Sequence, residues 1–299
     1  MSEFTLLEVI PVGNILGECM LWDEVTGCAW WTDIHGRRLH RYHLANKKLQ
    51  VFELPTRLCA FGFVDKDERL VGAFAEGFAY YTPGTGELDW LTQPESGFTG
   101  TRFNDGRVDR QGRFWSGTMV ENAPATDAAG NAVTGSLYCL TGDQAQKRLG
   151  EIRISNSLCW SPDAATAYFA DSPTGVIRAF DFDAASGSLG NARDFVRVPD
   201  GSAPDGSVID SKGCLWNAHW GGGRVVRYSP QGDVLAELAL PVTQPTCICF
   251  GGPDLDLLFV TTATENLDDA ALAQQPEAGH VFVYRTPFKG LPESRYRLA

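Results

Sequence analysis

The stretches NDGRVDRQGRFW (residues 104–115) and DGSVIDSKGCLW (residues 205–216) are two copies of one pattern. Each begins with a short polar residue and reaches an apolar residue four positions later. Each then turns through a cluster that contains glycine and ends on a tryptophan. Apolar residues on both sides of such a turn are typical of a β-hairpin. A hairpin that occurs twice in one chain indicates a repeat.

Four further segments share the pattern: ECMLWDEVTGCAWW, AFGFVDKDERLV, NSLCWSPDAATAYF and TCICFGGPDLDLLF. The first residues of the six segments are 42, 44, 52, 49 and 41 positions apart, and a large apolar residue follows 11 or 13 positions into each. The two offsets, 11 and 13, differ by two, so the large apolar residue stays on the same face of its strand in every segment. Each segment continues with a third strand and usually a fourth, for instance RLHRYHL and GSLYCLT after the first and third segments.

Six units of about four strands predict an all-β fold, a six-bladed β-propeller, as a single domain over residues 1–299. The N-terminal stretch FTLLEVIPV belongs to no unit, so we expect it to complete the last blade and close the ring. Residues 268–275 are the one region with helical periodicity. Two unrelated sandwiches, the alternative architecture, would not explain the shared offsets.

The composition narrows the class of protein. With 25 basic and 37 acidic residues the net charge is −12, which disfavours nucleic acid and anionic membrane surfaces as partners. The sequence has no run of 18 apolar residues and its start has no signal-peptide pattern, so we expect a cytoplasmic protein that does not span a membrane. The eight cysteines have no C-x-x-C spacing and are expected to be reduced and buried. The oligomeric state stays open.

Polar residues occupy one equivalent position of the repeat. The first strand of each propeller blade lines the central channel, so the first residues of the six segments should form a ring. These residues are Glu18, Ala60, Asn104, Asn156, Asp205 and Thr246. Any one of them could be only a turn or capping residue, as in the Pro-Asp-Gly turn at 204–206. Four carboxylate or amide side chains in register favour a shared divalent cation, because their oxygens are hard ligands. No His or Cys joins the ring, which disfavours structural zinc.

Four motifs resemble those of the senescence marker protein (regucalcin), gluconolactonase and luciferin-regenerating enzyme family: LGECMLWD, TRFNDGRVDRQGRFWSGTM, ISNSLCWSPD and PDGSVIDSKGCLWNAHWGG. The resemblance extends over nearly the whole chain. It implies a six-bladed propeller with one divalent cation in its channel and, for many members, hydrolysis of sugar lactones. Ca²⁺ is the favoured cation, with Mg²⁺, Mn²⁺, Zn²⁺ or Fe²⁺ as alternatives.

The same resemblance implies roles for individual residues. The metal ligands would be Glu18, Asn156 and Asp205, and the substrate contacts would be Arg102, Asn104 and Glu121, the last with Asn122 alongside it. Asp205 would also be the catalytic base. His219, in NAHWGGG, is a further candidate for substrate contact because it follows the fifth segment toward the expected channel mouth; a purely structural role is its alternative.

The motifs of competing chemistries are absent from the sequence. It contains no G-x-S-x-G, no phosphate-binding or dinucleotide-binding glycine loop and no EF-hand spacing. We therefore predict a metal-dependent hydrolase that opens an aldonolactone, such as a glucono-, galactono-, arabino- or xylonolactone, to the aldonic acid. The alternatives are a hydrolase of organophosphates or other esters on the same propeller, a calcium-binding regulatory protein of the regucalcin type, and a propeller that binds another protein.

Overall fold

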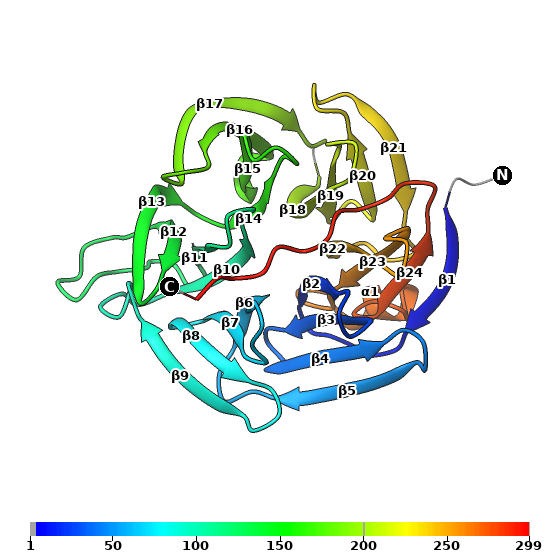
Figure 1. Ribbon diagram of the computed structural model, residues 1–299, viewed down its shortest axis with the longest axis horizontal. Coiled ribbons are helices and arrows are strands. Elements are labelled where there is room, and N and C mark those ends of the chain that lie inside the picture. Colours follow the sequence, from blue (N-terminus) through cyan, green and yellow to red (C-terminus); the bar gives the residue numbers. More distant parts are fainter. Residues whose placement is uncertain (1–3, 200, 299) are drawn as a thin grey trace.

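Six four-stranded sheets surround a central axis, and one strand of each sheet faces that axis (Figure 1). The computed structural model describes residues 4–199 and 201–298 of the 299-residue chain. The innermost strands are β2 (Gly17–Asp23), β6 (Leu58–Phe63), β10 (Thr101–Val108), β14 (Ser155–Trp160), β18 (Ala203–Ile209) and β22 (Pro245–Gly251). Each holds the start of one of the six repeat segments. The six-bladed β-propeller predicted from the repeat is confirmed.

The remaining strands follow outward from the axis in the order of the chain, except that β1 is the outermost strand of the last blade. The second strands are β3 (Cys28–Asp33), β7 (Leu70–Phe74), β11 (Phe114–Val120), β15 (Thr166–Asp171), β19 (Leu215–Trp220) and β23 (Leu257–Thr262). The third strands are β4 (Arg38–His43), β8 (Gly77–Thr82), β12 (Gly135–Thr141), β16 (Val176–Asp183), β20 (Arg224–Tyr228) and β24 (Val281–Arg285). The outermost strands are β5 (Lys48–Glu53), β9 (Glu87–Thr92), β13 (Gln144–Ile152), β17 (Ser188–Arg197), β21 (Val234–Ala239) and β1 (Thr5–Ile10).

The ring is closed by the two ends of the chain. The N-terminal strand β1 pairs antiparallel with β24, with Thr5 opposite Arg285, and so forms the outer strand of the sheet that contains β22 and β23. The last blade thereby reaches four strands like the other five, and the first and last strands of the chain are hydrogen bonded to each other.

An aspartate and a tryptophan shape the hairpin of the repeat. In the third blade the Asp109 side chain accepts hydrogen bonds from the backbone NH groups of residues 111 and 113 and, at 2.9 Å, from Trp115 Nε1. In the fifth blade Asp210 repeats the arrangement with Trp216 Nε1 at 3.1 Å. A carboxylate that binds the backbone two and four residues later stabilises a tight turn. This contact explains why D-x-x-G-x-x-W recurs in the sequence.

The core lies between neighbouring blades. The large apolar residue near the end of each segment is buried in all six blades: Trp31, Val71, Trp115, Phe169, Trp216 and Phe259. Such residues meet the apolar residue at the fifth position of the next segment, as in Trp115–Trp160 with ring centroids 5.7 Å apart and Trp216–Phe250 at 5.4 Å. Each aromatic pair of this kind contributes about 1 kcal/mol beyond the burial of its area. The repeated apolar positions therefore hold the blades together.

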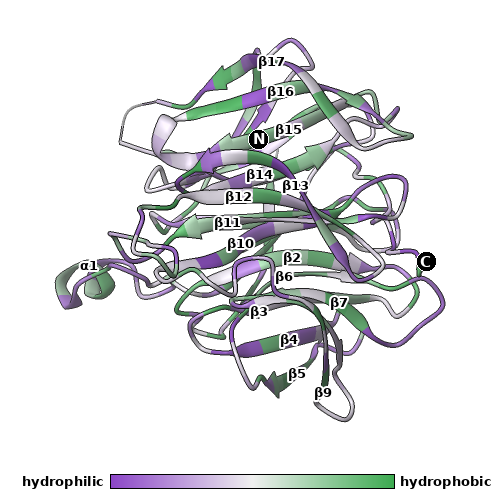
Figure 2. Cartoon of the chain, turned by 90° about the vertical axis from the view of Figure 1, so that its left-hand side faces the viewer, coloured by the Kyte–Doolittle hydropathy of each residue, from purple (hydrophilic) through white to green (hydrophobic). Residues whose placement is uncertain are grey.

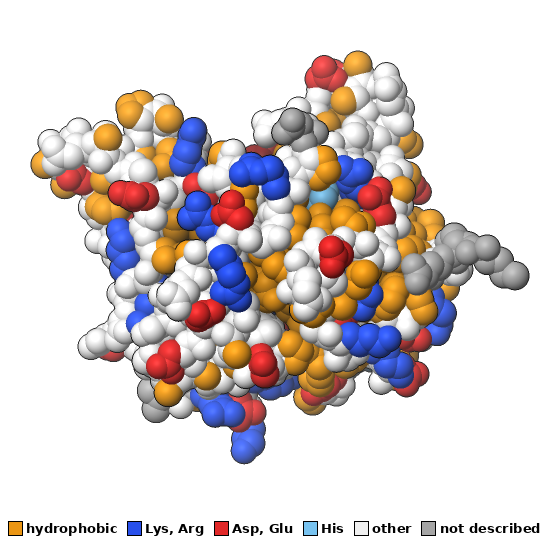
Figure 3. Space-filling model, turned by 90° about the horizontal axis from the view of Figure 1, so that it is seen from above, with side chains coloured by type: hydrophobic (Ala, Val, Ile, Leu, Met, Phe, Trp, Pro, Cys, Tyr) orange, Lys and Arg blue, Asp and Glu red, His pale blue; other side chains and the backbone are white. Residues whose placement is uncertain are grey.

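The outer surface carries charges of both signs. Lys and Arg side chains are interspersed with Asp and Glu on the side of the propeller seen in Figure 3. The short helix α1 (Asp269–Gln274) lies where helical periodicity predicted it. No helix in the described ranges is long and apolar enough to cross a membrane. The eight cysteines are free and buried, as expected.

A C-terminal strap, residues 286–298, crosses one end of the channel (Figure 1). It accepts a hydrogen bond from Ser211 N on Lys289 O, and it donates from Tyr296 N to Phe63 O at 2.7 Å. Glu293 of the strap forms a 2.8 Å ion pair with Arg107 of β10. Figure 2 shows the C-terminus and α1 at opposite faces of the molecule. One mouth of the channel is thus covered by the chain's own end.

Candidate functional site

A cavity of about 220 Å³ lies where the innermost strands begin. Five residues that the sequence singled out line it together: Glu18, Arg102, Asn104, Asn156 and Asp205. They come from four different blades, as the ring position predicted. Ala60 and Thr246, the other ring members, do not line the cavity; the Thr246 hydroxyl instead donates to Gly17 O. The volume is below the ~300 Å³ at which pockets for drug-sized ligands begin, and it suits a small molecule.

β-Bulges aim the ring residues at this cavity. In β2, Glu18 pairs with Thr32 of β3 and Leu21 pairs with Trp30. Between these two pairs β2 advances by three residues and β3 by only two. The same extra residue follows Asn156 in β14. The residue after each of these two ring members has a left-handed backbone, with φ of 50° at Cys19 and 62° at Ser157. Bulges and such strained conformations of non-glycine residues gather at functional sites, where they redirect a side chain.

The two carboxylates of the ring are buried near each other. Glu18 is 7% exposed and Asp205 4%. Burial, followed by the repulsion of Asp105, raises the pKa of Glu18 to about 8. Burial and the Glu18 carboxylate raise the pKa of Asp205 well above its ordinary value. Among the described residues, no side chain donates a hydrogen bond to either carboxylate or forms an ion pair with it. Two buried carboxylates with no ion-pair partner among the described residues favour a bound cation, which would lower both pKa values.

The amide of Asn156 is oriented by its neighbours. Its Nδ2 donates to Ser172 Oγ at 2.9 Å, and Ser172 in turn donates to Pro204 O at 2.7 Å. The Asn156 oxygen therefore points away from Ser172, where it accepts from Asn104 Nδ2 at 3.2 Å. Because Asn104 also donates to Ser155 O, both of its amide hydrogens are used within the protein. Asn104 can thus offer a ligand only its oxygen, which already accepts from Arg102 Nη1 at 2.7 Å.

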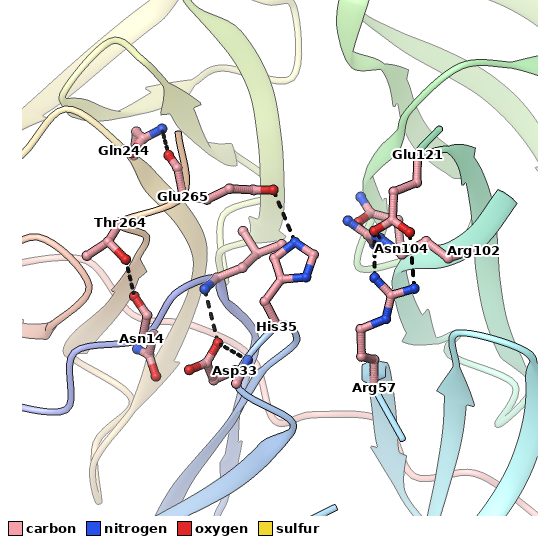
Figure 4. Close-up of polar contacts among 12 residues, drawn as sticks. Asn14, Asp33, His35, Arg57, Arg102, Asn104, Glu121, Gln244, Thr264 and Glu265 are labelled. Atoms are coloured by element: carbon pink, nitrogen blue, oxygen red, sulfur yellow. Dashed lines mark hydrogen bonds and ion pairs between the residues drawn. The ribbon is translucent and has the colours of Figure 1, made fainter. Parts of the chain in front are cut away.

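Glu121 holds Arg102 in place rather than lining the cavity. Arg102 Nε donates to Glu121 Oε1 at 2.8 Å, and Arg57 binds the same carboxylate through both of its terminal nitrogens, at 2.6 and 3.0 Å (Figure 4). Burial alone would raise the pKa of Glu121, but the two arginines outweigh it and lower the pKa. Nε and Nη1 of Arg102 donate to Glu121, Phe103 O and Asn104, which leaves Nη2 as the donor that can serve a ligand.

The structure does not bring His219 to the cavity. Its ring is 1% exposed, and Nε2 lies 3.0 Å from Tyr228 Oη in the same blade. Burial and Arg224 lower the pKa of His219 to about 4. Because side chains alternate along a strand, the next residue, Trp220, faces the cavity instead. The expected substrate contact is therefore replaced by the structural role that was its alternative.

Sequence reasoning missed Glu265, which lines the cavity opposite Arg102 (Figure 4). It follows β23 in a loop outside the repeated positions, so the repeat carried no signal for it. Glu265 Oε1 lies 3.1 Å from His35 Nε2. The orienting roles of Ser172 and Arg57 were likewise not predicted, because each depends on a contact between different blades.

The donor set suits a hard divalent cation. Glu18 and Asp205 offer carboxylate oxygens and Asn156 an amide oxygen, which are ligands that Ca²⁺, Mg²⁺ and Mn²⁺ accept. Within the described ranges no three His, Cys, Asp or Glu side chains form a metal-binding group on their own, so the third protein ligand would have to be the amide. The central metal site stays a prediction.

The chain is similar to known proteins over nearly its whole length. Residues 16–264 match the family model described as the SMP-30/Gluconolactonase/LRE-like region. The chain is 38% identical to the 6-deoxy-6-sulfogluconolactonase of Pseudomonas putida, with 97% of each chain covered. It is 37% identical to the L-arabinolactonase of Azospirillum brasilense, with 95% of this chain and 92% of the relative covered. The solved structure of a calcium-binding protein, regucalcin, from Agrobacterium tumefaciens superposes with a TM-score of 0.89 at 35% identity, covering 98% of both chains.

Proposed function

This chain belongs to the SMP-30/gluconolactonase/LRE-like family, and from that premise we propose that it is a lactonase that opens sugar lactones to aldonic acids. The substrates we propose are neutral aldonolactones of the glucono-, galactono-, arabino- or xylono- type. One observation carries the proposal: a small cavity joins two buried carboxylates that form no ion pair among the described residues, an oriented amide oxygen and an arginine.

We propose that Glu18, Asn156 and Asp205 hold one divalent cation, with Ca²⁺ favoured. When bound, such a cation supplies a Lewis acid for the lactone carbonyl and makes a nearby water more acidic. The unbalanced carboxylates supply the electrostatic reason for binding, since Glu18 and Asp205 repel each other in its absence. The similar regucalcin from Agrobacterium tumefaciens is described as a calcium-binding protein, which supports the choice of Ca²⁺.

The chain's own residues then position the substrate and move the proton. Arg102 Nη2 donates to a ring hydroxyl, and Glu121 and Arg57 keep the guanidinium from turning. The Asp205 carboxylate accepts a proton from the attacking water as its oxygen bonds to the carbonyl carbon. The bond from that carbon to the ring oxygen breaks, and the proton passes to the ring oxygen as the new hydroxyl.

The test is the rate of hydrolysis of a panel of aldonolactones after chelation and re-addition of single cations. We expect turnover well above the spontaneous rate that depends on the added cation. A calcium-binding regulator would bind Ca²⁺ without turning over any lactone. A hydrolase of organophosphates would act on a phosphotriester faster than on every lactone of the panel. Either result would overturn the proposed function.

A further inference from the structure

The cavity contains more negative than positive charge. Among the described residues that line it, Glu18, Asp205 and Glu265 are acidic and Arg102 is the one with a permanent positive charge. A divalent cation held by Glu18 and Asp205 would balance those two carboxylates and would leave Glu265 as an additional negative group.

The positive charge opposite Glu265 is already partly neutralised. Arg102 donates to the Glu121 carboxylate, and Arg57 shares that carboxylate. The three side chains together carry a net charge of one. A negative substituent on a substrate would therefore meet, among the described lining residues, only the Arg102 guanidinium, whose charge is shared with Glu121.

Glu265 is fixed where it can act on such a substituent. Its backbone NH donates to Ile15 O at 3.0 Å, and its carbonyl accepts from Gln244 Nε2 at 2.9 Å. One carboxylate oxygen is held by His35 at 3.1 Å, and the side chain is 29% exposed. Figure 4 shows it extending toward His35 on the side of the site away from Arg102. The carboxylate thus has a fixed place at the wall of the cavity.

We propose that Glu265 determines substrate specificity by charge: it accepts hydrogen bonds from hydroxyl groups of a neutral lactone and disfavours lactones with a sulfonate, phosphate or carboxylate at the end of the sugar. This inference rests on the proposed lactonase function. A carboxylate within several ångströms of a second anion at the edge of a protein costs enough to change its binding by about tenfold or more. A hydroxyl group at the same place gains an acceptor.

The test uses two lactones with the same ring, one ending in a hydroxymethyl group and one in a sulfonate. We expect the wild-type protein to prefer the neutral lactone in kcat/KM by at least about tenfold. Glu265→Gln keeps the shape of the side chain and should raise the ratio of sulfonated to neutral kcat/KM by about tenfold. Glu265→Lys should raise the ratio further, and high salt should reduce the differences.

Glu237→Gln is the matched control, because it removes one negative charge from an exposed carboxylate paired with Arg224 outside the cavity. The control should leave the ratio at the wild-type value. Equal kcat/KM for both lactones in the wild-type protein would overturn the proposed role of Glu265. The same ratio in the wild type, Glu265→Gln and Glu265→Lys would also overturn it. Absence of turnover of either lactone would instead contradict the proposed function, so the two failures are distinguishable.

Discussion

Asn156 and Ser172 form a directed hydrogen bond in which Asn156 Nδ2 donates to Ser172 Oγ at 2.9 Å. The direction is fixed because the single hydroxyl hydrogen of Ser172 is used on Pro204 O. Ser172 can therefore only accept from Asn156, and the amide must present its oxygen elsewhere. A residue of the short turn after β15 thus decides which atom of Asn156 a cation would meet.

Replacing Ser172 with alanine should weaken cation binding. The Asn156 amide loses the partner that orients it, and loss of such an outer contact typically lowers metal affinity by about tenfold or more. Titration calorimetry with Ca²⁺ or Mn²⁺ measures the effect. Thr174→Val is the control, since Thr174 lies in the same turn and donates only to Asp171 O. Equal affinities for Ser172→Ala and the wild type would show that Asn156 needs no such orientation.

Glu121→Gln should impair the use of substrate. A neutral side chain cannot hold both Arg102 and Arg57, so the Arg102 guanidinium loses its fixed position. We expect kcat/KM to fall roughly 10–100-fold, because small misplacements of a positioning group have effects of this size. Steady-state kinetics measures it. The exposed Glu76, which accepts from Thr56 Oγ1 on the neighbouring loop, supplies the control Glu76→Gln. A wild-type kcat/KM in Glu121→Gln would contradict the assignment.

Glu293→Ala should destabilise the propeller. Glu293 and Arg107 are 14% and 10% exposed, so the change leaves a largely buried guanidinium without its partner. Breaking a buried pair in this way costs about 3 kcal/mol or more in the free energy of unfolding. Urea denaturation measures it. The exposed pair Arg38–Glu53 is the comparison, and Glu53→Ala should cost under about 1 kcal/mol. Equal costs for the two variants would show that the strap does not stabilise the channel end.

Acid should destabilise the protein through its buried histidines. Burial lowers the pKa values of His219 and His40 to about 4, below the ordinary 6.5. Between these values the unfolded chain binds protons that the folded chain does not, so stability falls as the pH falls from about 6.5 to 4. The limiting slope is about 1.4 kcal/mol per pH unit for each histidine. His219→Gln should flatten the dependence of the urea midpoint on pH over this window. An unchanged dependence would mean that His219 is protonated in the folded protein.

The repeat made much of the fold and of the ring predictable from the sequence. Each of the six segments begins on an innermost strand, and Asp205 and Glu18 meet at one cavity because their positions in the repeat are equivalent. This inference needed only the period of the pattern and the geometry of a closed ring of blades.

The rest depends on contacts that no periodicity encodes. Glu265 lies on a loop after β23, and Arg57 reaches Glu121 across 64 residues of sequence. His219 was expected near the channel mouth because it follows the fifth segment, but side chains alternate along β19, and Trp220 is the one that lines the cavity. The strap was not predicted, since its residues follow β24 and belong to no repeated segment.

A cation-dependent lactonase site built on Asp205 is tested most directly by comparing the wild type with Asp205→Asn. Both proteins are stripped of metal and titrated with one divalent cation while aldonolactone hydrolysis is followed. Asparagine keeps the shape of the side chain and removes its charge and basicity. We predict that the wild type loses activity in chelator and regains it with the cation, and that a folded Asp205→Asn protein stays at the spontaneous rate throughout. Undiminished wild-type activity in chelator, or wild-type rates from Asp205→Asn, would contradict a cation-dependent lactonase site built on Asp205.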